Sequence, residues 1–499
     1  MSCALGLLLL GLAVLAGQQA PRNTHIVAGH GSASVVTGDP FTQAFETGWM
    51  LDDTNHDGVA DAIRGKVVVP AEPSAAENAA AANVAARLAH GSTGLTPPLV
   101  VTATAAPATG PFIYIGAGAV PSAKADSVKS WTFRLAKGEG RVAAITQDNS
   151  ANHDLVIVGD DAGITAAADA FSARAPYLWK VGSSAERFDA IVAAVDAAAP
   201  EAHAQLVGLS YLSGEAGINK AYVTTVNPVT DAQLATAISS PKLAAVHELF
   251  VLNGTGIHAV NPKAFHPPSE AAPGAAGGNA AAGGDDSAAD AGGTGDTPPA
   301  DAAAPTAAGG GRGGAGGRGG APAAGGTVSG LDLANLYTSH GLFSASGRIP
   351  VPANSTSHLY VPAAAAGVAM ANLAARMGLE STGITLPIAS AAASASPRTI
   401  ATQAVVAGDS PLAVAIEKKM TTGDTSLAEA PALSAGEGEL RVVDRAFGAR
   451  AALLVRGDNA GATAALDLAA DHLPNLWQPG KQYTSLEDVR YDLHQFFSL

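Results

Sequence analysis

Residues 83–99 decide the fold, because the chain contains this stretch twice. They read Asn-Val-Ala-Ala-Arg-Leu-Ala-His-Gly-Ser-Thr-Gly-Leu-Thr-Pro-Pro-Leu, and residues 372–388 read Asn-Leu-Ala-Ala-Arg-Met-Gly-Leu-Glu-Ser-Thr-Gly-Ile-Thr-Leu-Pro-Ile. The two stretches align without a gap, and the second begins 289 residues after the first. A match of this length, at polar and apolar positions alike, indicates an internal repeat rather than a shared alanine bias.

Landmarks farther along the chain support the duplication at a slightly larger offset of 298 residues. They are Gly-Glu-Gly at 138–140 and 436–438, Gly-Asp-Asp-Ala-Gly at 159–163 and Gly-Asp-Asn-Ala-Gly at 457–461, and Pro176 and Trp179 with Pro474 and Trp477. Landmarks in one order and at nearly one spacing predict two copies of one structural unit.

The first copy can be interpreted element by element. Ser74, followed three residues later by Glu77, forms a capping box, which predicts a helix that runs to about His90. Val84 and Leu88 would share one face of that helix. The other expected elements are strands at 66–69, 99–102 and 112–115, a hairpin-like pair at 141–146 and 154–158, and a second helix from Asp160 or Asp161 to about Ala173. Helices over one mixed sheet predict an α/β (α+β) fold in which each copy is a two-layer α/β sandwich.

Changes in composition divide the chain into segments. We expect a signal peptide at 1–20, a first α/β repeat unit at 45–200, a small α/β segment at 204–262, a disordered Gly/Ala-rich linker at 267–330, a second repeat unit at 331–480 and the start of a C-terminal helix at 484–499. The small segment is predicted from a strand at 221–226, a helix at 231–238 and a hairpin formed by 248–253 and 256–260. The linker has almost no large apolar side chain, so it cannot bury enough surface to offset the entropy of ordering.

The N-terminus predicts export. An unbroken apolar run from Ala4 to Ala16 is typical of a secretory signal, so the protein is expected to be secreted or periplasmic. No basic residue precedes the run, and a buried core element is the alternative interpretation. Cys3 is the only cysteine and lies before the run, so the processed chain would contain no disulfide. No later segment is long and apolar enough to predict a membrane span.

The C-terminal residues predict a helix that is still in progress. Leu486, Val489 and Leu493 form an apolar stripe, and the chain ends at Leu499 without a glycine or proline stop signal. We expect the natural protein, or its ancestor, to continue beyond this point. The alternative is a helix that docks and ends there.

Composition limits the partners of the chain. The formal net charge is −15, whereas binding to nucleic acid or to anionic lipid requires a basic surface. Aromatic residues make up 5% of the chain, so stacking platforms for sugars would be few. We expect a polysaccharide or another cell-envelope component as the partner, as the family resemblance described below implies.

The clearest binding motif is Asp-Thr-Asn-His-Asp-Gly-Val-Ala-Asp at 53–61. Oxygen ligands at every second position, followed by a glycine for the sharp turn, suit calcium. The expected ligands of a structural Ca²⁺ ion are the side chains of Asp53, Asn55, Asp57 and Asp61 and the carbonyl of Val59. The motif resembles the short calcium loops of dockerin and thrombospondin type-3 repeats, but it departs from an EF-hand because position twelve is Arg64 instead of Glu. An Asp/Asn-rich surface turn is the alternative.

Other motifs give weaker signals. Gly116-Ala117-Gly118 follows a strand, but the third glycine of a dinucleotide loop is absent. The turns at Asp160 and Asp458 are better explained as helix caps than as anion sites. No nucleophile, base and orienting group stand together in a known pattern, so no catalytic residue is predicted.

The order of Thr-Gly-Leu-x-x-Pro-Leu, Ile-Tyr-Ile-Gly, Gly-Glu-Gly and Gly-Asp-Asp-Ala-Gly resembles a known domain. It is similar to the small α/β domain that precedes the catalytic barrel in β-N-acetylhexosaminidases and related glycoside hydrolases. The likeness covers about 66–174 and again about 348–472. It implies an accessory domain without catalytic residues, and the paired Asp-Glu of the catalytic barrel has no match in this chain. Duplicated α/β modules of envelope polysaccharide export proteins are a looser likeness.

These observations lead to one functional hypothesis and two rivals. The leading hypothesis is an exported, non-catalytic scaffold or accessory region, for instance the N-terminal part of a larger envelope hydrolase. The first rival is a hydrolase with a site between the two copies that uses the turns at Asp160 and Asp458. The second rival is a carbohydrate-binding or adhesive module, for which Trp179 and Trp477 are the equivalent aromatic candidates.

Overall fold

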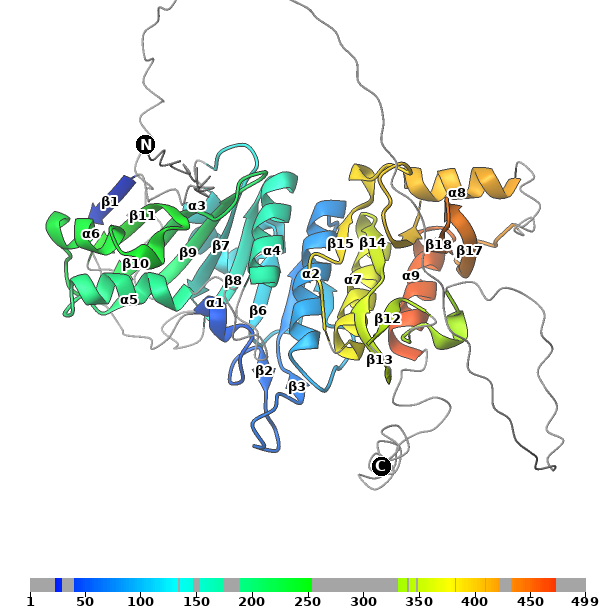
Figure 1. Ribbon diagram of the computed structural model, residues 1–499, viewed down its shortest axis with the longest axis horizontal. Coiled ribbons are helices and arrows are strands. Elements are labelled where there is room, and N and C mark those ends of the chain that lie inside the picture. The colour runs from blue at the N-terminus through cyan, green and yellow to red at the C-terminus, as the bar shows by residue number, and fades with distance from the viewer. Residues whose placement is uncertain are drawn as a thin grey trace, which may run out of the picture. The chain divides into compact units, whose positions relative to one another are not determined.

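The computed structural model describes residues 23–28, 40–132, 135–146, 153–174, 188–253, 331–338, 341–346, 349–381, 383–408, 410–421 and 432–472. The predicted signal peptide, linker and C-terminal helix lie outside these residues, as do Trp179, Trp477 and the predicted strand at 256–260. The two main sheets belong to one compact unit (Figure 1).

The first copy and the segment after it form one sheet of nine strands, in the order β1-β11-β10-β9-β7-β8-β6-β4-β5. The strands are β1 (Asn23–Ala28), β4 (Lys66–Val69), β5 (Val100–Thr102), β6 (Phe112–Ile115), β7 (Glu139–Thr146), β8 (His153–Gly159), β9 (Ala204–Leu212), β10 (Ile218–Thr225) and β11 (Val246–Asn253). A separate ribbon pairs β2 (Leu51–Asp52) with β3 (Ala62–Ile63).

The second copy forms a sheet of five strands, in the order β15-β14-β16-β18-β17. The strands are β14 (Ser357–Val361), β15 (Ala389–Ala391), β16 (Gln403–Ala407), β17 (Glu439–Phe447) and β18 (Arg450–Arg456). A two-stranded ribbon of β12 (Phe343–Ser346) and β13 (Ile349–Ser355) precedes it.

The two sheets share one five-stranded plan. The order β7-β8-β6-β4-β5 matches β17-β18-β16-β14-β15. In each copy the pair at one end, β7 with β8 or β17 with β18, is antiparallel, and the remaining pairs are parallel. The predicted α/β fold with two copies of one unit is therefore confirmed.

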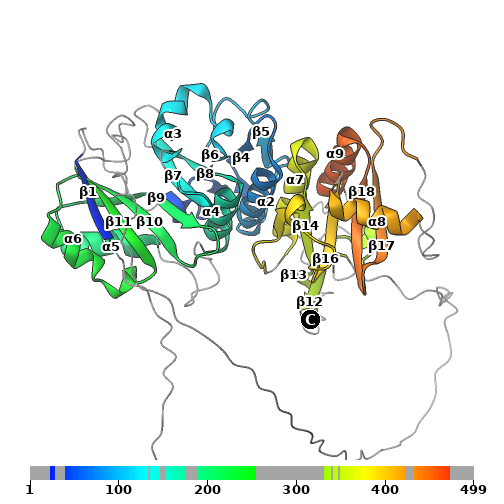
Figure 2. The same cartoon turned by 90° about the horizontal axis from the view of Figure 1, so that it is seen from above.

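The helices in the described part of the chain are α1 (Pro40–Gln43), α2 (Ala75–His90), α3 (Ala125–Thr132), α4 (Asp161–Arg174), α5 (Phe188–Ala198), α6 (Asp231–Ile238), α7 (Ala364–Glu380), α8 (Pro411–Thr421) and α9 (Asn459–Asp467). Helices α2, α3 and α4 of the first copy correspond to α7, α8 and α9 of the second. Helix α2 packs against α4, and α7 packs against α9 in the same way. Figure 2 shows α3 on the face of the first sheet opposite to α2 and α4, and α8 on the face of the second sheet opposite to α7 and α9.

Helix α2 begins where the sequence predicts. The Ser74 hydroxyl accepts from the Glu77 amide at 3.1 Å, and the Glu77 carboxylate accepts from the Ser74 amide at 2.8 Å. Its residues are mostly alanine and are buried around nearly the whole circumference, because α7 lies alongside (Figures 1 and 2). The backbones approach closely: a Cβ added to Gly378 would lie 2.1 Å from the carbonyl oxygen of Ala86.

The predicted small α/β segment at 204–262 contributes its strands to the sheet of the first copy. Strand β9 pairs antiparallel with β7, and β10, β11 and β1 extend the same sheet. The helix at Asp231–Ile238 is confirmed, whereas β9, α3 and α5 were not predicted. Strand β9 has eight consecutive buried residues because it lies inside a wide sheet, so it lacks the apolar–polar alternation of a surface strand.

Asn83, on α2, binds the edge strand of the other copy. Its Oδ1 accepts hydrogen bonds from the backbone amides of Ile388 and Ala389, both at 3.0 Å. Its Nδ2 donates to the carbonyl of Ala389 at 3.0 Å. The side-chain amide thus takes the place of a neighbouring strand beside β15.

Asn372, the equivalent residue on α7, returns the same set of bonds. Its Oδ1 accepts from the amides of Leu99 and Val100, both at 2.8 Å, and its Nδ2 donates to the Val100 carbonyl at 3.0 Å. Each copy therefore completes the edge of the other, and buried backbone groups at β5 and β15 that would otherwise lack partners are satisfied.

Candidate functional site

The Gly-Glu-Gly and Gly-Asp-Asp-Ala-Gly motifs meet in one corner of the first copy. Asp160 accepts from the amide of Gly163 at 2.8 Å and from the amide of Gly138 at 2.9 Å. The bonds from Gly138 and Gly163 hold the pKa of Asp160 below its usual range. One carboxylate oxygen of Asp160 thus caps the start of α4, and the other binds the turn before β7.

Asp458 repeats this arrangement in the second copy. It accepts from the amides of Gly461 and Gly436 at 2.8 and 2.9 Å, and these bonds likewise lower its pKa. A Cβ added to Gly438 would lie 1.8 Å from the carbonyl oxygen of Gly461, so only glycine fits this helix–strand contact. Asp160 and Asp458 thus take part in equivalent structural corners.

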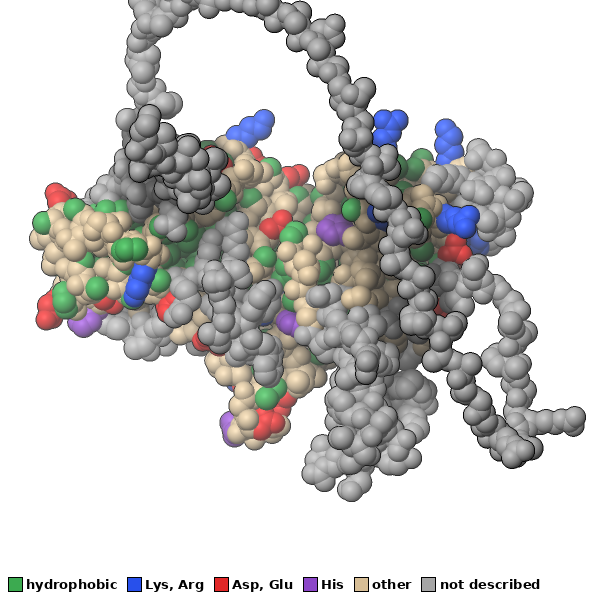
Figure 3. All heavy atoms as spheres, in the orientation of Figure 1, with side chains coloured by type: hydrophobic (Ala, Val, Ile, Leu, Met, Phe, Trp, Pro, Cys, Tyr) green, Lys and Arg blue, Asp and Glu red, His purple; other side chains and the backbone are tan. Residues whose placement is uncertain are grey.

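The calcium-like loop lies between β2 and β3, and acidic side chains gather at its tip (Figure 3). Asp53 accepts from the amides of Asp57 at 3.1 Å and Gly58 at 2.8 Å. Asn55 accepts from the amide of Asp57 at 3.0 Å, and Asp57 from that of Val59 at 2.9 Å. Gly58 has a φ of 89°, the left-handed conformation that the turn requires.

Asp61, the last ligand of the predicted set, has other partners. Asp61 accepts from the amide of Thr54 at 2.9 Å and from its hydroxyl at 2.7 Å, which lowers the pKa of Asp61. In the described part of the chain, no three His, Cys, Asp or Glu side chains are grouped so as to hold a metal ion. The donor atoms suit calcium in kind, and the loop brings Asp53, Asn55 and Asp57 together through shared backbone bonds.

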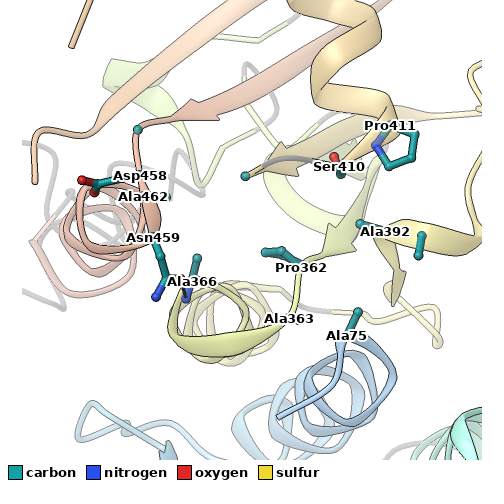
Figure 4. Close-up of a pocket in the computed structure, with 13 residues that line it drawn as sticks. Ala75, Pro362, Ala363, Ala366, Ala392, Ser410, Pro411, Asp458, Asn459 and Ala462 are labelled. Carbon is teal, nitrogen blue, oxygen red and sulfur yellow. Dashed lines mark hydrogen bonds between the residues drawn. The ribbon is translucent and has the colours of Figure 1, made fainter. Parts of the chain in front are cut away.

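One hollow lies where the parallel strands β14, β16 and β18 end and helices α7, α8 and α9 begin (Figure 4). It has a volume of about 370 Å³ and is lined mainly by alanine, glycine and proline. This edge is where ligands bind in many open α/β sheets.

The polar side chains of this hollow already serve the helix starts. Ser410 accepts from the amide of Ala413 at 3.2 Å, and Asp458 caps α9. Asn459, which points toward Ala366 in Figure 4, accepts from the amide of that residue at 3.1 Å. The hollow lies where ligand sites occur in open α/β sheets, but its side-chain chemistry is that of helix capping.

A larger hollow of about 860 Å³ lies between the two copies. Helices α2 and α4, the β9–β10 turn and the segment around β15 line it, and its acidic residues are Asp161, Asp169 and Glu215. Asp169 accepts from Nδ2 of Asn83 at 2.9 Å, yet burial raises the pKa of Asp169 to about 6. This hollow therefore borders the same asparagine that joins the copies.

Ser390, which lines this larger hollow, forms a hydrogen bond with a histidine. Its hydroxyl lies 2.9 Å from Nε2 of His358 on the neighbouring strand β14. Burial lowers the pKa of His358 to about 4, so the imidazole is neutral at pH 7. A neutral imidazole within hydrogen-bond distance of a serine is the minimum for an activated nucleophile, although such a low pKa makes it a weak base.

Asn83 and Asn372 are part of the repeated stretch, but no signal in the sequence indicates their role at the interface. Asp169 was not predicted, and neither was the pair of Ser390 and His358, which lie 32 residues apart in the chain. No local motif marks Ser390 and His358, because they meet only through the pairing of β14 with β15.

A scan against protein-family models found no match for this chain, and a search of curated proteins found no similar protein. Among the described residues, none of the helices is both long and apolar enough to cross a membrane.

The raised pKa of Asp169 predicts a pH dependence of stability. Its value of about 6 in the folded state exceeds the ordinary 3.8, so the folded state binds this proton more tightly than the unfolded state. Stability from this group is therefore greatest below pH 4 and declines as the pH rises through 6. Asp169→Asn should remove this decline and raise the free energy of unfolding at pH 7.5 by about 3 kcal/mol.

Urea denaturation at pH 4.5, 5.5 and 7.5 measures this effect. Glu201→Gln, at an exposed position, is the control and should leave the pH profile unchanged. An Asp169→Asn profile that still falls between pH 4.5 and 7.5 as steeply as the wild type would contradict the assignment.

Proposed function

We propose that this chain is a non-catalytic scaffold or accessory region of an exported protein that acts beside a hydrolase of the cell envelope. The observation that carries the proposal is the reciprocal binding of edge strands by Asn83 and Asn372. This reciprocal binding uses the polar side chains of the interface to join the two copies into one body. Such an arrangement suits a rigid spacer or a docking platform. A polysaccharide or another envelope component is the proposed partner.

The carboxylates considered for catalysis support this proposal. Asp160 and Asp458 make the same two backbone bonds in both copies. A carboxylate that makes the same two backbone bonds in both copies is better explained by a role in folding than by a role in catalysis. Helix caps of this kind stabilise the chain without contacting a ligand.

A hydrolase in the larger hollow is a second candidate. The contact between Ser390 and His358 favours it, because it brings a hydroxyl and a base together beside a hollow of about 860 Å³. Its weakness is the low pKa of His358, about 4, which limits proton abstraction at neutral pH.

A hydrolase screen separates the two candidates. We expect the purified chain to show no turnover of glycosidic, ester or peptide substrates above the buffer blank. Ser390→Ala, Asp160→Asn and Asp458→Asn should each leave that background unchanged, while the two aspartate variants melt at lower temperature because a helix cap is weakened. Turnover that Ser390→Ala abolishes and Ser394→Ala retains would overturn the scaffold proposal in favour of the second candidate.

We also propose that residues 53–61 bind one structural calcium ion. Asp53, Asn55 and Asp57 would bind through their side chains and Val59 through its carbonyl, with Asp61 direct or bridged by water. The ion would stabilise the turn between β2 and β3.

Calorimetry with calcium tests the loop directly. We expect one site with a dissociation constant of about 10⁻⁴–10⁻³ M, the range of extracellular modules, and a higher melting temperature in calcium. Asp53→Ala should abolish both effects, whereas Asp231→Asn, outside the loop, should retain them. Absence of binding heat together with an unchanged melting temperature would make the loop a plain surface turn.

A further inference from the structure

The outer edge of β17 differs from its counterpart in the first copy. In the first copy β7 lies inside the sheet, because β9 pairs with it antiparallel from Glu139↔Leu212 to Ala143↔Gly208. Strand β17 is the last strand of its sheet, and in the described part of the chain no strand pairs with its outer side.

Side-chain burial follows this difference. Val142 on β7 is fully buried, with Leu209 of β9 directly opposite. Its equivalent at the offset of 298, Leu440 on β17, remains partly exposed although it packs on the main core. Val442 is partly exposed in the same way, whereas its equivalent Ala144 is buried. Apolar area that a strand covers in one copy is thus open to solvent in the other.

The other face of β17 is charged. Glu439 accepts from Nε of Arg441 at 2.8 Å and from Nη1 of Arg456 at 2.5 Å. In the first copy the position equivalent to Glu439 is Arg141, which is buried together with Glu139 and lies opposite Ser210 of β9. An arriving strand at β17 would therefore need apolar residues on one face and small or hydroxyl-bearing residues on the other.

The sequence of β9 has this pattern. If it paired with β17 in the register it uses on β7, Leu209 would face Leu440, Ser210 would face Glu439, and Gly208 would leave room beside Arg441. The geometry of the duplicated sheets leads us to infer that the outer edge of β17 is a docking site for one antiparallel β-strand of this pattern, supplied by a partner polypeptide. Such strand addition gives affinity through backbone bonds and selectivity through alternate side chains.

The usable edge is short. The pairing of β17 with β18 becomes irregular after Val443, and Arg445 has a φ of 52°. A bulge of this kind ends regular pairing and protects an edge from indiscriminate association. Docking is therefore confined to Glu439–Val443. The inference is independent of the proposed accessory role, because a chain that turned over substrate would still carry this edge.

A peptide of residues 203–213, which contains β9, is the probe. We expect it to bind the intact chain at one site, measured by fluorescence anisotropy of the labelled peptide. Alternate amides of a strand face the same neighbour, so N-methylation of one alternate set should weaken binding at least tenfold, while methylation of the other set should not. This comparison needs no change in the protein.

Two variants locate the site. Leu440→Asp should weaken peptide binding at least tenfold, whereas Val414→Asp, at an exposed position on α8, should not change it. No binding of the peptide at all, or binding that both methylated peptides lose to the same extent, would overturn the inference. Dimerisation of the chain that Leu440→Asp abolishes, seen by sedimentation, would assign the edge to a second copy and equally overturn it.

Discussion

The fold depends on how each copy closes the edge of its sheet. Strands β5 and β15 end their parallel arrays with backbone groups that are buried against the neighbouring copy and need hydrogen-bond partners. A buried amide or carbonyl without a partner costs about 1–3 kcal/mol. Asn83 and Asn372 supply donors and acceptors in a single short side chain, so each copy is completed only by the other.

This constraint explains the unusual composition of the central helices. An asparagine side chain reaches a strand of the other copy only if the two helix backbones lie close together. Alanine and glycine on α2 and α7 permit that approach, as the contact of Gly378 with the backbone at Ala86 demonstrates. The two sheets differ at the edge farthest from the interface between the copies. The first sheet continues beyond β7 through β9, whereas the second ends at β17.

Local signals predicted much of the fold. The capping box at Ser74, the buried strand β6 and the helix α6 depend on neighbouring residues, and their positions are confirmed. The joining of residues 204–253 to the first sheet could not be predicted, because it depends on the long-range pairing of β9 with β7. The roles of Asn83 and Asn372 were missed for the same reason, and calcium binding at residues 53–61 stays a prediction.

Amide hydrogen exchange on the single variants Asn83→Ala and Asn372→Ala tests the reciprocal bond most directly. Loss of Asn83 should speed exchange at Ile388 and Ala389 in the opposite copy by at least tenfold while Leu99 and Val100 stay protected, and loss of Asn372 should give the mirror result. Exchange that accelerates only in the copy carrying the substitution, or at neither edge, would contradict the view that each copy completes the other.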